Sequence, residues 1–188
     1  MIAVAEPRLS LSPLGPSLQP APGRYRLDAS RCIAEFTVRH LLFAAARGRM
    51  RPRDGELWID PDDPRDSWVR VDFDAATLVT HNRERDRALC GPDLLDVERY
   101  PVVRFESFDV MSVGDGTLTV AGDLYAGDAC TEVTLDAQLV HLDAERVRFA
   151  ATGTVSRRSL GLQWGALEDV GVLIADAVTI IVAAEFLR

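Results

Sequence analysis

The side chains that could do chemistry are few and lie far apart in the sequence. His40, His81 and His141 have no partner at metal-ligand spacing, so we expect no metal site. No nucleophile-elbow motif or glycine-rich phosphate loop is present, and Ser107 has no evident base. The acidic pair Asp62-Asp63, like Glu168-Asp169, falls in a loop without signs of a cleft. We therefore expect a binding protein without catalytic residues or a cofactor.

The three cysteines and the net negative charge exclude further classes of protein. Cys32, Cys90 and Cys130 form no CxxC pair, which excludes a zinc ribbon and a thioredoxin-like motif. Free thiols suit a reducing compartment, and we expect a cytoplasmic protein. The net charge of -8 argues against nucleic-acid binding. No apolar run reaches the roughly 20 residues of a membrane-spanning helix, so we expect no stable membrane insertion.

Short segments with alternating apolar and polar residues must position any site. Val147, Phe149 and Ala151 share one face of such a segment, while Arg146 and Arg148 share the other. This period of two predicts antiparallel strands that are buried on one face. The predicted strands are 24–28, 33–40, 47–59, 67–77, 102–111, 117–126, 131–142, 145–156 and 176–187.

Three stretches depart from simple strands. Residues 82–96 are predicted to be helical, with Asn82 as cap and Gly91-Pro92 as the end of the first turn. Residues 157–175 form a long connection. The strand 47–59 contains Pro52, so we expect it to be broken or bent, and its four alternating arginines should face solvent.

The predicted strands suffice for a closed barrel with a small interior. About eight strands can close into a barrel, which either packs its centre solid or holds one small ligand. Small residues recur on the predicted buried faces, which favours an apolar cavity over a solid core; they are Ala34, Gly122, Ala126, Ala137, Ala151, Gly153 and Ala184. The solid barrel, used as an interaction module, remains an alternative.

Several motifs resemble one family. The segment from Thr80 to Ser107 resembles the signature of the YceI-like family, lipocalin-like proteins that bind polyisoprenoids. The matching positions are Arg85-Asp86, Leu89, Asp93, Leu95-Asp96, Tyr100-Pro101 and Phe105-x-Ser107. Upstream, Phe36-x-Val38-Arg39-His40-Leu41 and Arg47-Gly48 are similar to the family pattern; downstream, so are Arg157 with Leu160-Gly161, Asp176-x-Val178 and Glu185. The resemblance covers about residues 24–187.

The resemblance implies an all-β, antiparallel, eight-stranded lipocalin-like barrel with one short helical segment, spanning residues 24–188. A proline-rich, flexible arm, residues 1–23, is expected to precede it. A homodimer is implied as well.

The resemblance also implies a function: binding, storage or transport of a long apolar chain, such as an isoprenoid, quinone or fatty lipid, inside the barrel. The alternation then gives the expected ligand-binding side chains Phe36, Val38, Phe73, Phe105, Leu124, Leu135 and Phe149, and the end of the barrel adds His40, Arg85, Arg157 and Trp164.

The polar members of this set allow two interpretations. Arg85 either forms a structural ion pair or cap with Asp86, or binds an anionic head group at the mouth. Arg157 and Arg158 have the same two alternatives. His40 either contacts a head group or bonds to the backbone, and it would be the acid or base if the protein were instead an enzyme acting on a hydrophobic substrate.

Overall fold

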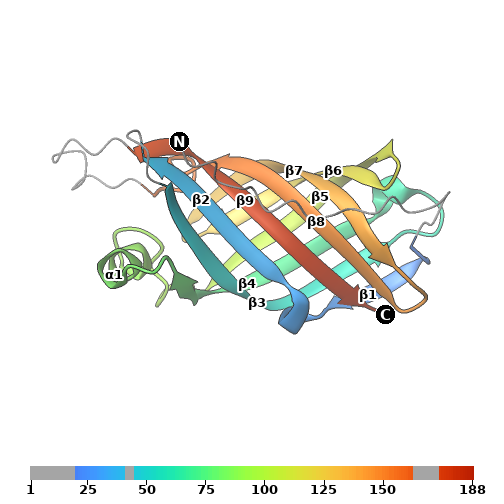
Figure 1. Ribbon diagram of the computed structural model, residues 1–188, viewed down its shortest axis with the longest axis horizontal. Coiled ribbons are helices and arrows are strands. Elements are labelled where there is room, and N and C mark those ends of the chain that lie inside the picture. Colours follow the sequence, from blue (N-terminus) through green and yellow to red (C-terminus); the bar gives the residue numbers. More distant parts are fainter. Residues whose placement is uncertain (1–19, 41–44, 163–173) are drawn as a thin grey trace, which may run out of the picture.

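The computed structural model describes residues 20–40, 45–162 and 174–188, which form a closed antiparallel β-barrel with one short α-helix (Figure 1). The strands are β1 (Gly23–Leu27), β2 (Ile33–His40), β3 (Ala45–Ile59), β4 (Trp68–Val79), β5 (Val102–Gly114), β6 (Thr117–Ala126), β7 (Ala129–Leu142), β8 (Arg146–Ser156) and β9 (Ile174–Leu187). The helix is α1 (Arg83–Cys90), and two 3₁₀ turns are η1 (Ala29–Arg31) and η2 (Pro64–Asp66).

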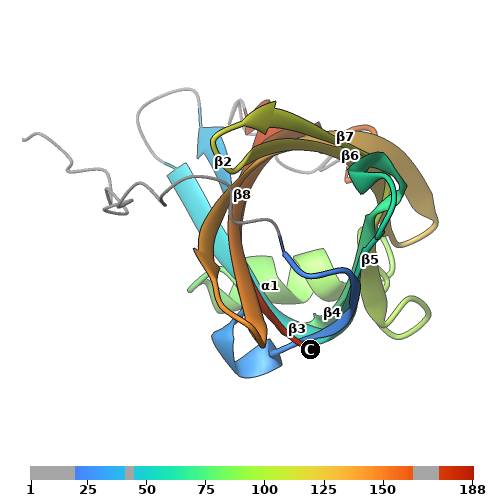
Figure 2. The ribbon, with the colours of Figure 1, turned by 90° about the vertical axis from the view of Figure 1, so that its right-hand side faces the viewer.

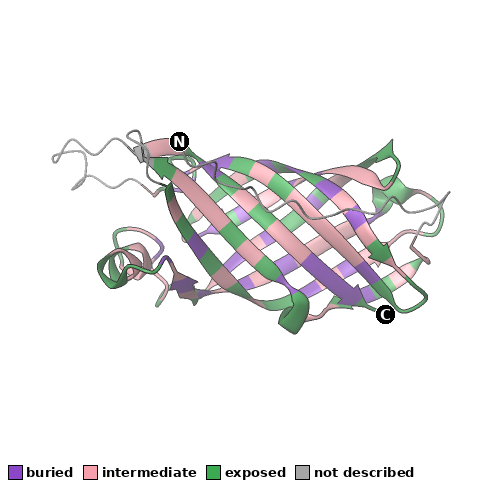
Figure 3. Ribbon diagram, viewed as in Figure 1, coloured by how far each residue is buried: buried purple, intermediate pink, exposed green. Residues whose placement is uncertain are grey.

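The alternation of residue types becomes alternation of burial. On β7 the apolar Val133, Leu135 and Ala137 are buried, whereas Thr134 and Asp136 are exposed. Figure 3 shows the same alternation of buried or intermediate and exposed residues along the neighbouring strands. Because side chains on a strand point to opposite faces in turn, one face of the sheet lines the inside of the barrel.

The barrel closes because β2 pairs with both β3 and β9, and β4 pairs with β3 and β5. β1 also pairs with β3 and β9, beyond the start of β2, so β1 and β2 share one position in the wall. The wall therefore has eight strand positions, as predicted, and Figure 2 shows it as a ring.

The barrel has two different ends, at opposite sides of Figure 1. At the α1 end lie α1, the β6–β7 turn and the start of β9. At the β1 end lie β1, η2, the β5–β6 and β7–β8 turns and the end of β9. Within the described chain, none of the helices is long and apolar enough to span a membrane.

The strand predicted to be broken or bent within residues 47–59 is continuous but irregularly paired. β3 is continuous from Ala45 to Ile59, but its register against β4 shifts between Arg49 and Arg51 and again between Pro52 and Asp54. Such irregularities accommodate Pro52, which lacks an amide hydrogen for the ladder. The arginines at positions 47, 49, 51 and 53 are exposed on the outer face, as expected.

The helix is shorter than the predicted segment 82–96. The Asn82 side chain accepts hydrogen bonds from the amides of Glu84 and Arg85, as a cap does. α1 ends at Cys90, and turns follow, because Pro92 cannot continue the hydrogen-bonding pattern of the helix. The predicted arm 1–23 lies mostly outside the described residues; β1 begins at Gly23, one residue before the predicted start.

Candidate functional site

The interior of the barrel holds a cavity of about 710 Å³. Its wall comes from β2 to β9 and from the residues around α1, and it consists almost entirely of aliphatic and aromatic side chains. β7 and β9 have 14 residues each, which corresponds to about 45 Å along a strand. At a tilt of about 40° the barrel is about 35 Å high, long enough for an extended hydrocarbon chain.

The structure places nine of the eleven predicted ligand-binding residues on the wall of this cavity; they are Phe36, Val38, Phe73, Arg85, Phe105, Leu124, Leu135, Phe149 and Arg157. Trp164 lies outside the described residues. His40 is the last residue of β2, but its side chain is also outside them. Contact of any of these residues with a ligand stays a prediction.

The small residues contribute to the cavity in two ways, which the sequence did not distinguish. The five alanines, Ala34, Ala126, Ala137, Ala151 and Ala184, line the open space. Gly122 and Gly153 instead lie beneath larger neighbours: a Cβ at Gly122 would lie 2.7 Å from the Phe105 ring, and one at Gly153 would lie 2.6 Å from Leu135. The two glycines therefore allow Phe105 and Leu135 to pack closely against the wall, and they do not themselves line the open space.

A further group of lining residues escaped the strand-based prediction. Met50 lies on β3, and Leu78 lies near the end of β4. The others are leucines of α1 and of the connections at the same end, namely Leu89, Leu94, Leu95, Leu160 and Leu162. Alternation gives no signal in connections. Leu89, Leu95 and Leu160 do belong to the motifs that matched the family pattern, so those motifs could have identified them.

Thr80 holds α1 against the barrel. It is buried, and its hydroxyl donates to Asp86 Oδ1 while accepting a hydrogen bond of 2.7 Å from Arg85 Nε. Arg85 Nη2 also donates to the Thr80 carbonyl at 2.8 Å, and Asp86 Oδ1 accepts from the Thr80 amide at 2.8 Å. The expected ion pair between Arg85 and Asp86 is replaced by two separate contacts with Thr80. The expected anchoring of the helical segment is present.

Arg157 and Arg158, adjacent in sequence, have opposite environments. Arg157 is only 8% exposed and lines the cavity, with Nε and Nη1 donating to the carbonyls of Ala175 and Leu162. Arg158 is exposed, and its Nε lies 3.8 Å from Asp176 Oδ1. A hydrogen bond from Ser156 and the amide and charge of Arg158 lower the pKa of Asp176. Of the two arginines, only Arg157 lines the cavity.

Several side chains at the β1 end are closely packed. Tyr25, Val147 and Phe186 are at most 2% exposed. The Tyr25 hydroxyl donates to the Ala21 carbonyl at 2.7 Å, and Arg188 Nη2 donates to the Pro22 carbonyl at 3.1 Å. Figure 2 shows this first part of the described chain, in blue, across the opening that faces the viewer.

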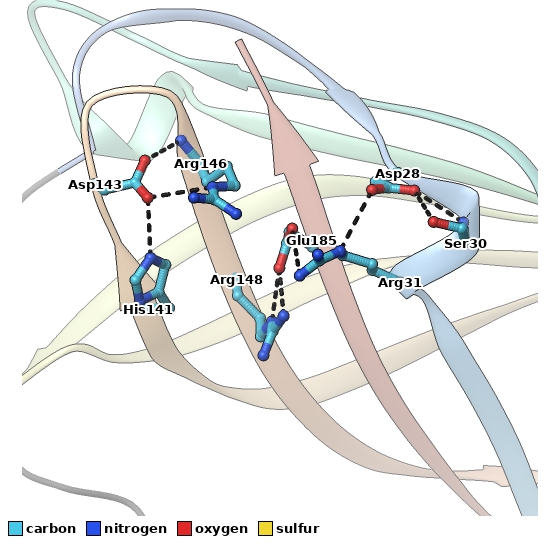
Figure 4. A network of polar contacts seen from close by, with 8 residues as sticks. All are labelled: Asp28, Ser30, Arg31, His141, Asp143, Arg146, Arg148 and Glu185. Atoms are coloured by element: carbon cyan, nitrogen blue, oxygen red, sulfur yellow. Dashed lines mark hydrogen bonds and ion pairs between the residues drawn. The ribbon is translucent and has the colours of Figure 1, made fainter.

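A buried carboxylate lies on the outer side of the wall at the same end. Glu185 is 2% exposed and accepts hydrogen bonds from Nε and Nη2 of Arg148, the first at 3.0 Å. Arg31 of η1 lies 3.6 Å from the other oxygen of Glu185 and 3.8 Å from Asp28 (Figure 4). These four residues, the Glu185 cluster, join η1 to β8 and β9. Sequence alternation predicts the outward direction of Glu185 but not its burial under η1.

The side chains that could serve as nucleophiles, bases or metal ligands show no catalytic arrangement among the described residues. Ser107 Oγ accepts a hydrogen bond from the Val69 amide at 2.9 Å. All three cysteines are free, as predicted, and burial raises the pKa of the Cys32 thiol to about 11. His141 is exposed and lies 3.1 Å from Asp143. Among the described side chains, no three of the types His, Cys, Asp and Glu gather as a metal site would require.

Solved structures with the same architecture include BcnA from Burkholderia cenocepacia, with a TM-score of 0.74 and 18% identity over 85% of this chain and 98% of that one. A polyisoprenoid binding domain from Saccharophagus degradans has a TM-score of 0.64 and 15% identity over 87% and 98% of the two chains. These likenesses establish the fold.

Sequence comparison gives the family. A UPF0312 protein of Pseudomonas putida is 30% identical over 146 residues, which cover 74% of this chain and 76% of the relative. Another from Serratia proteamaculans is 29% identical over 171 residues, or 87% and 86% of the two chains. The sequence model of the YceI-like domain matches residues 25–186. The chain therefore belongs to the YceI-like family.

Proposed function

We propose that this protein binds one lipid with a long apolar chain, such as an isoprenoid, a quinone or a fatty lipid, inside the barrel and stores or carries it. The observation that carries the proposal is the cavity of about 710 Å³ with its apolar wall. Its volume lies within the usual range of small-molecule sites. The solid-barrel alternative does not fit this open interior.

The energetics of the cavity favour an occupant. Water would find few hydrogen-bond partners there. A hydrocarbon chain gains about 0.8 kcal/mol for each buried methylene, so twelve methylenes contribute about 10 kcal/mol before the cost of association.

Binding rather than catalysis is part of the proposal. The fold neighbour from Saccharophagus degradans is a polyisoprenoid binding domain, which supports an apolar ligand here. The enzyme alternative depends on His40, whose side chain lies outside the described residues. A cytoplasmic location and a homodimer stay predictions.

The first experiment is native mass spectrometry of the purified protein, which should show a co-purified lipid or, after delipidation, uptake of farnesol or a short-tailed quinone at a ratio of one to one. Absence of both would contradict the proposal.

A matched pair of variants tests whether the cavity is the binding site. Ala151 lines the cavity, whereas its neighbour Ala150 lies on the opposite face of β8. Ala151→Phe should reduce farnesol affinity at least about tenfold, because the ring would occupy the space of the ligand. Ala150→Phe should bind farnesol like the wild type. Equal affinity in the two variants would place the ligand outside the barrel.

A further inference from the structure

A stripe of exposed arginines runs along the outer face of the barrel, from the α1 end toward the middle of the wall. This arginine stripe consists of Arg39 on β2 and of Arg47, Arg49, Arg51 and Arg53 on β3. Residues next to them in sequence line the cavity, among them Val38, Ala46 and Met50, so the alternating arginines point away from it. Between Arg47 and Arg53 the stripe extends about 20 Å along β3.

Ion pairs do not neutralise the arginine stripe. Within the described residues, no carboxylate oxygen lies within 4 Å of its guanidinium groups, whereas other arginines on the outside of the barrel are paired. Three carboxylates that form no ion pair in this part of the chain border the stripe. Glu35 is opposite Arg49 and Asp74 is opposite Arg51 in register, and Asp54 follows the stripe on β3. These acids offset only part of the charge, so the stripe stays positive.

The opposite side of the barrel has the reverse charge. β6 and β7 lie across the ring of strands from β3 (Figure 2), and they contain Asp123, Glu132 and Asp136 but no arginine. The net charge of -8 is therefore unevenly distributed over the outer surface. Such a separation of charge orients a protein in the field of a charged partner. An anionic surface would attract the arginine stripe even though the protein as a whole is acidic.

The surroundings of the stripe favour a lipid surface over a protein as the partner. Protein interfaces depend on aromatic or aliphatic anchors that become buried between the two partners. Among the described side chains of β3, none is both large, apolar and exposed, and the residue opposite Arg47 on β2 is Thr37. Attraction to anionic lipids needs no such anchor, because each basic residue near the membrane gains from its negative surface potential.

We propose that the arginine stripe binds the surface of an anionic phospholipid membrane. Arg39 and Arg47 lie at the α1 end, where the exposed Asn82 and Glu84 border the cavity. A barrel bound through the stripe therefore has this end beside the membrane. The contact is peripheral and reversible, because it is electrostatic and the acidic remainder of the protein opposes it. This inference goes beyond the proposed function, since binding to a membrane surface does not require a lipid in the cavity.

Co-sedimentation of the full chain with vesicles tests the inference. Vesicles of phosphatidylcholine with about one-third phosphatidylglycerol should retain the protein at low salt, whereas pure phosphatidylcholine should not. Salt at about 0.5 M should release it, because the Debye length then falls to a few ångströms. Equal retention by both kinds of vesicle, or none by the anionic ones, would overturn the inference but leave farnesol binding and the proposed function intact. Binding to heparin without binding to vesicles would indicate another polyanion and would also overturn it.

Two double variants with the same net charge assign vesicle binding to the stripe. Arg47→Gln with Arg49→Gln should weaken binding to the anionic vesicles about tenfold or more. Arg26→Gln with Arg146→Gln removes two exposed arginines at the β1 end and should weaken it less than about threefold. Both should bind farnesol like the wild type, because none of the four side chains lines the cavity, and this also shows that they fold. Equal weakening by the two would mean that net charge alone acts, against a binding role of the stripe.

Discussion

The β1 end of the barrel contains its largest fully buried side chains, Tyr25, Glu185 and Val147, whereas α1 at the other end has no buried residue at all. At the β1 end, Tyr25 and Phe186 are almost fully buried, and the Glu185 cluster joins η1 to the outer wall. At the α1 end, Thr80 makes the hydrogen bonds that attach the helix, Leu89 and Cys90 are only partly buried against the core, and exposed polar residues border the cavity.

Under the proposed function, this difference assigns stability to the β1 end and ligand access to the α1 end. A barrel that must admit a ligand needs one end that opens at low energetic cost, and locally unstable elements usually serve that purpose. The closed end must then supply the packing that the open end lacks. Substitutions at the two ends should accordingly have different kinds of effect.

The largest expected effect is that of Tyr25→Ala at the β1 end. It removes a fully buried ring and a hydrogen bond to Ala21, which should lower the free energy of unfolding by about 3–5 kcal/mol in urea denaturation. Tyr125, at the α1 end of β6, is 39% exposed, so Tyr125→Ala should cost less than about 1 kcal/mol. Equal losses would abolish the distinction between the ends.

Next in size is Glu185→Gln, which removes the shared charge of the Glu185 cluster. Arg148 and Arg31 keep 39% and 52% of their side chains exposed, so water can solvate them. The expected loss of about 2 kcal/mol is therefore smaller than that for a fully buried pair. Glu145→Gln, in the exposed β7–β8 turn, is the control and should change stability by less than about 0.5 kcal/mol. In a double-mutant cycle, the stability losses of Glu185→Gln and Arg148→Met should not add up in the double variant. Additive losses would argue against coupling between Glu185 and Arg148.

At the α1 end, Thr80→Val should act mainly on ligand exchange. It deletes the hydroxyl that joins Arg85 to Asp86, which costs about 1–2 kcal/mol. Amide exchange of α1 should accelerate, and release of bound farnesol in stopped-flow measurements should be faster. Thr134→Val, on the outer face of β7, should change neither rate. Unchanged release by Thr80→Val would show that α1 does not control access.

The smallest expected effect is on the unfolding free energy at acidic pH. The side chain of Arg65 lowers the pKa of Asp63 to about 2, and the amide of Glu145 together with His141 lowers that of Asp143 to about 2. Because both pKa values are depressed in the folded state, the stabilisation is present above about pH 4 and is lost as the pH falls toward 2. Asp63→Asn and Asp143→Asn should each reduce the pH dependence of the unfolding free energy in this interval. A slope like that of the wild type would show that these exposed groups contribute nothing.

The strands could be predicted because their signal is local. The predicted bounds 33–40 and 117–126 agree with β2 and β6, where alternation is regular and turns flank the segments. The cavity itself could be anticipated from the alanines, since they retain little volume whatever their neighbours are.

The features that the sequence did not predict depend mostly on contacts between residues far apart in the chain. Burial of Glu185 requires Arg31 and η1, which come from the other end of the chain. Gly122 differs from Ala137 only because the ring of Phe105 on the adjacent strand covers it. The contact of Arg85 with Thr80, in place of Asp86, depends on the angle at which α1 leaves β4, which residue types do not specify.

The pairing between β2 and β9 determines when the barrel can close during synthesis and folding. Ala34 pairs with Val182, so the wall stays incomplete until nearly the whole chain has been synthesised. Such distant pairing slows folding, and the unpaired borders of the growing sheet are exposed to aggregation meanwhile. Under the proposed function, loading with lipid would therefore follow translation of the final strand, and a chain truncated before β9 would have no enclosed space to fill.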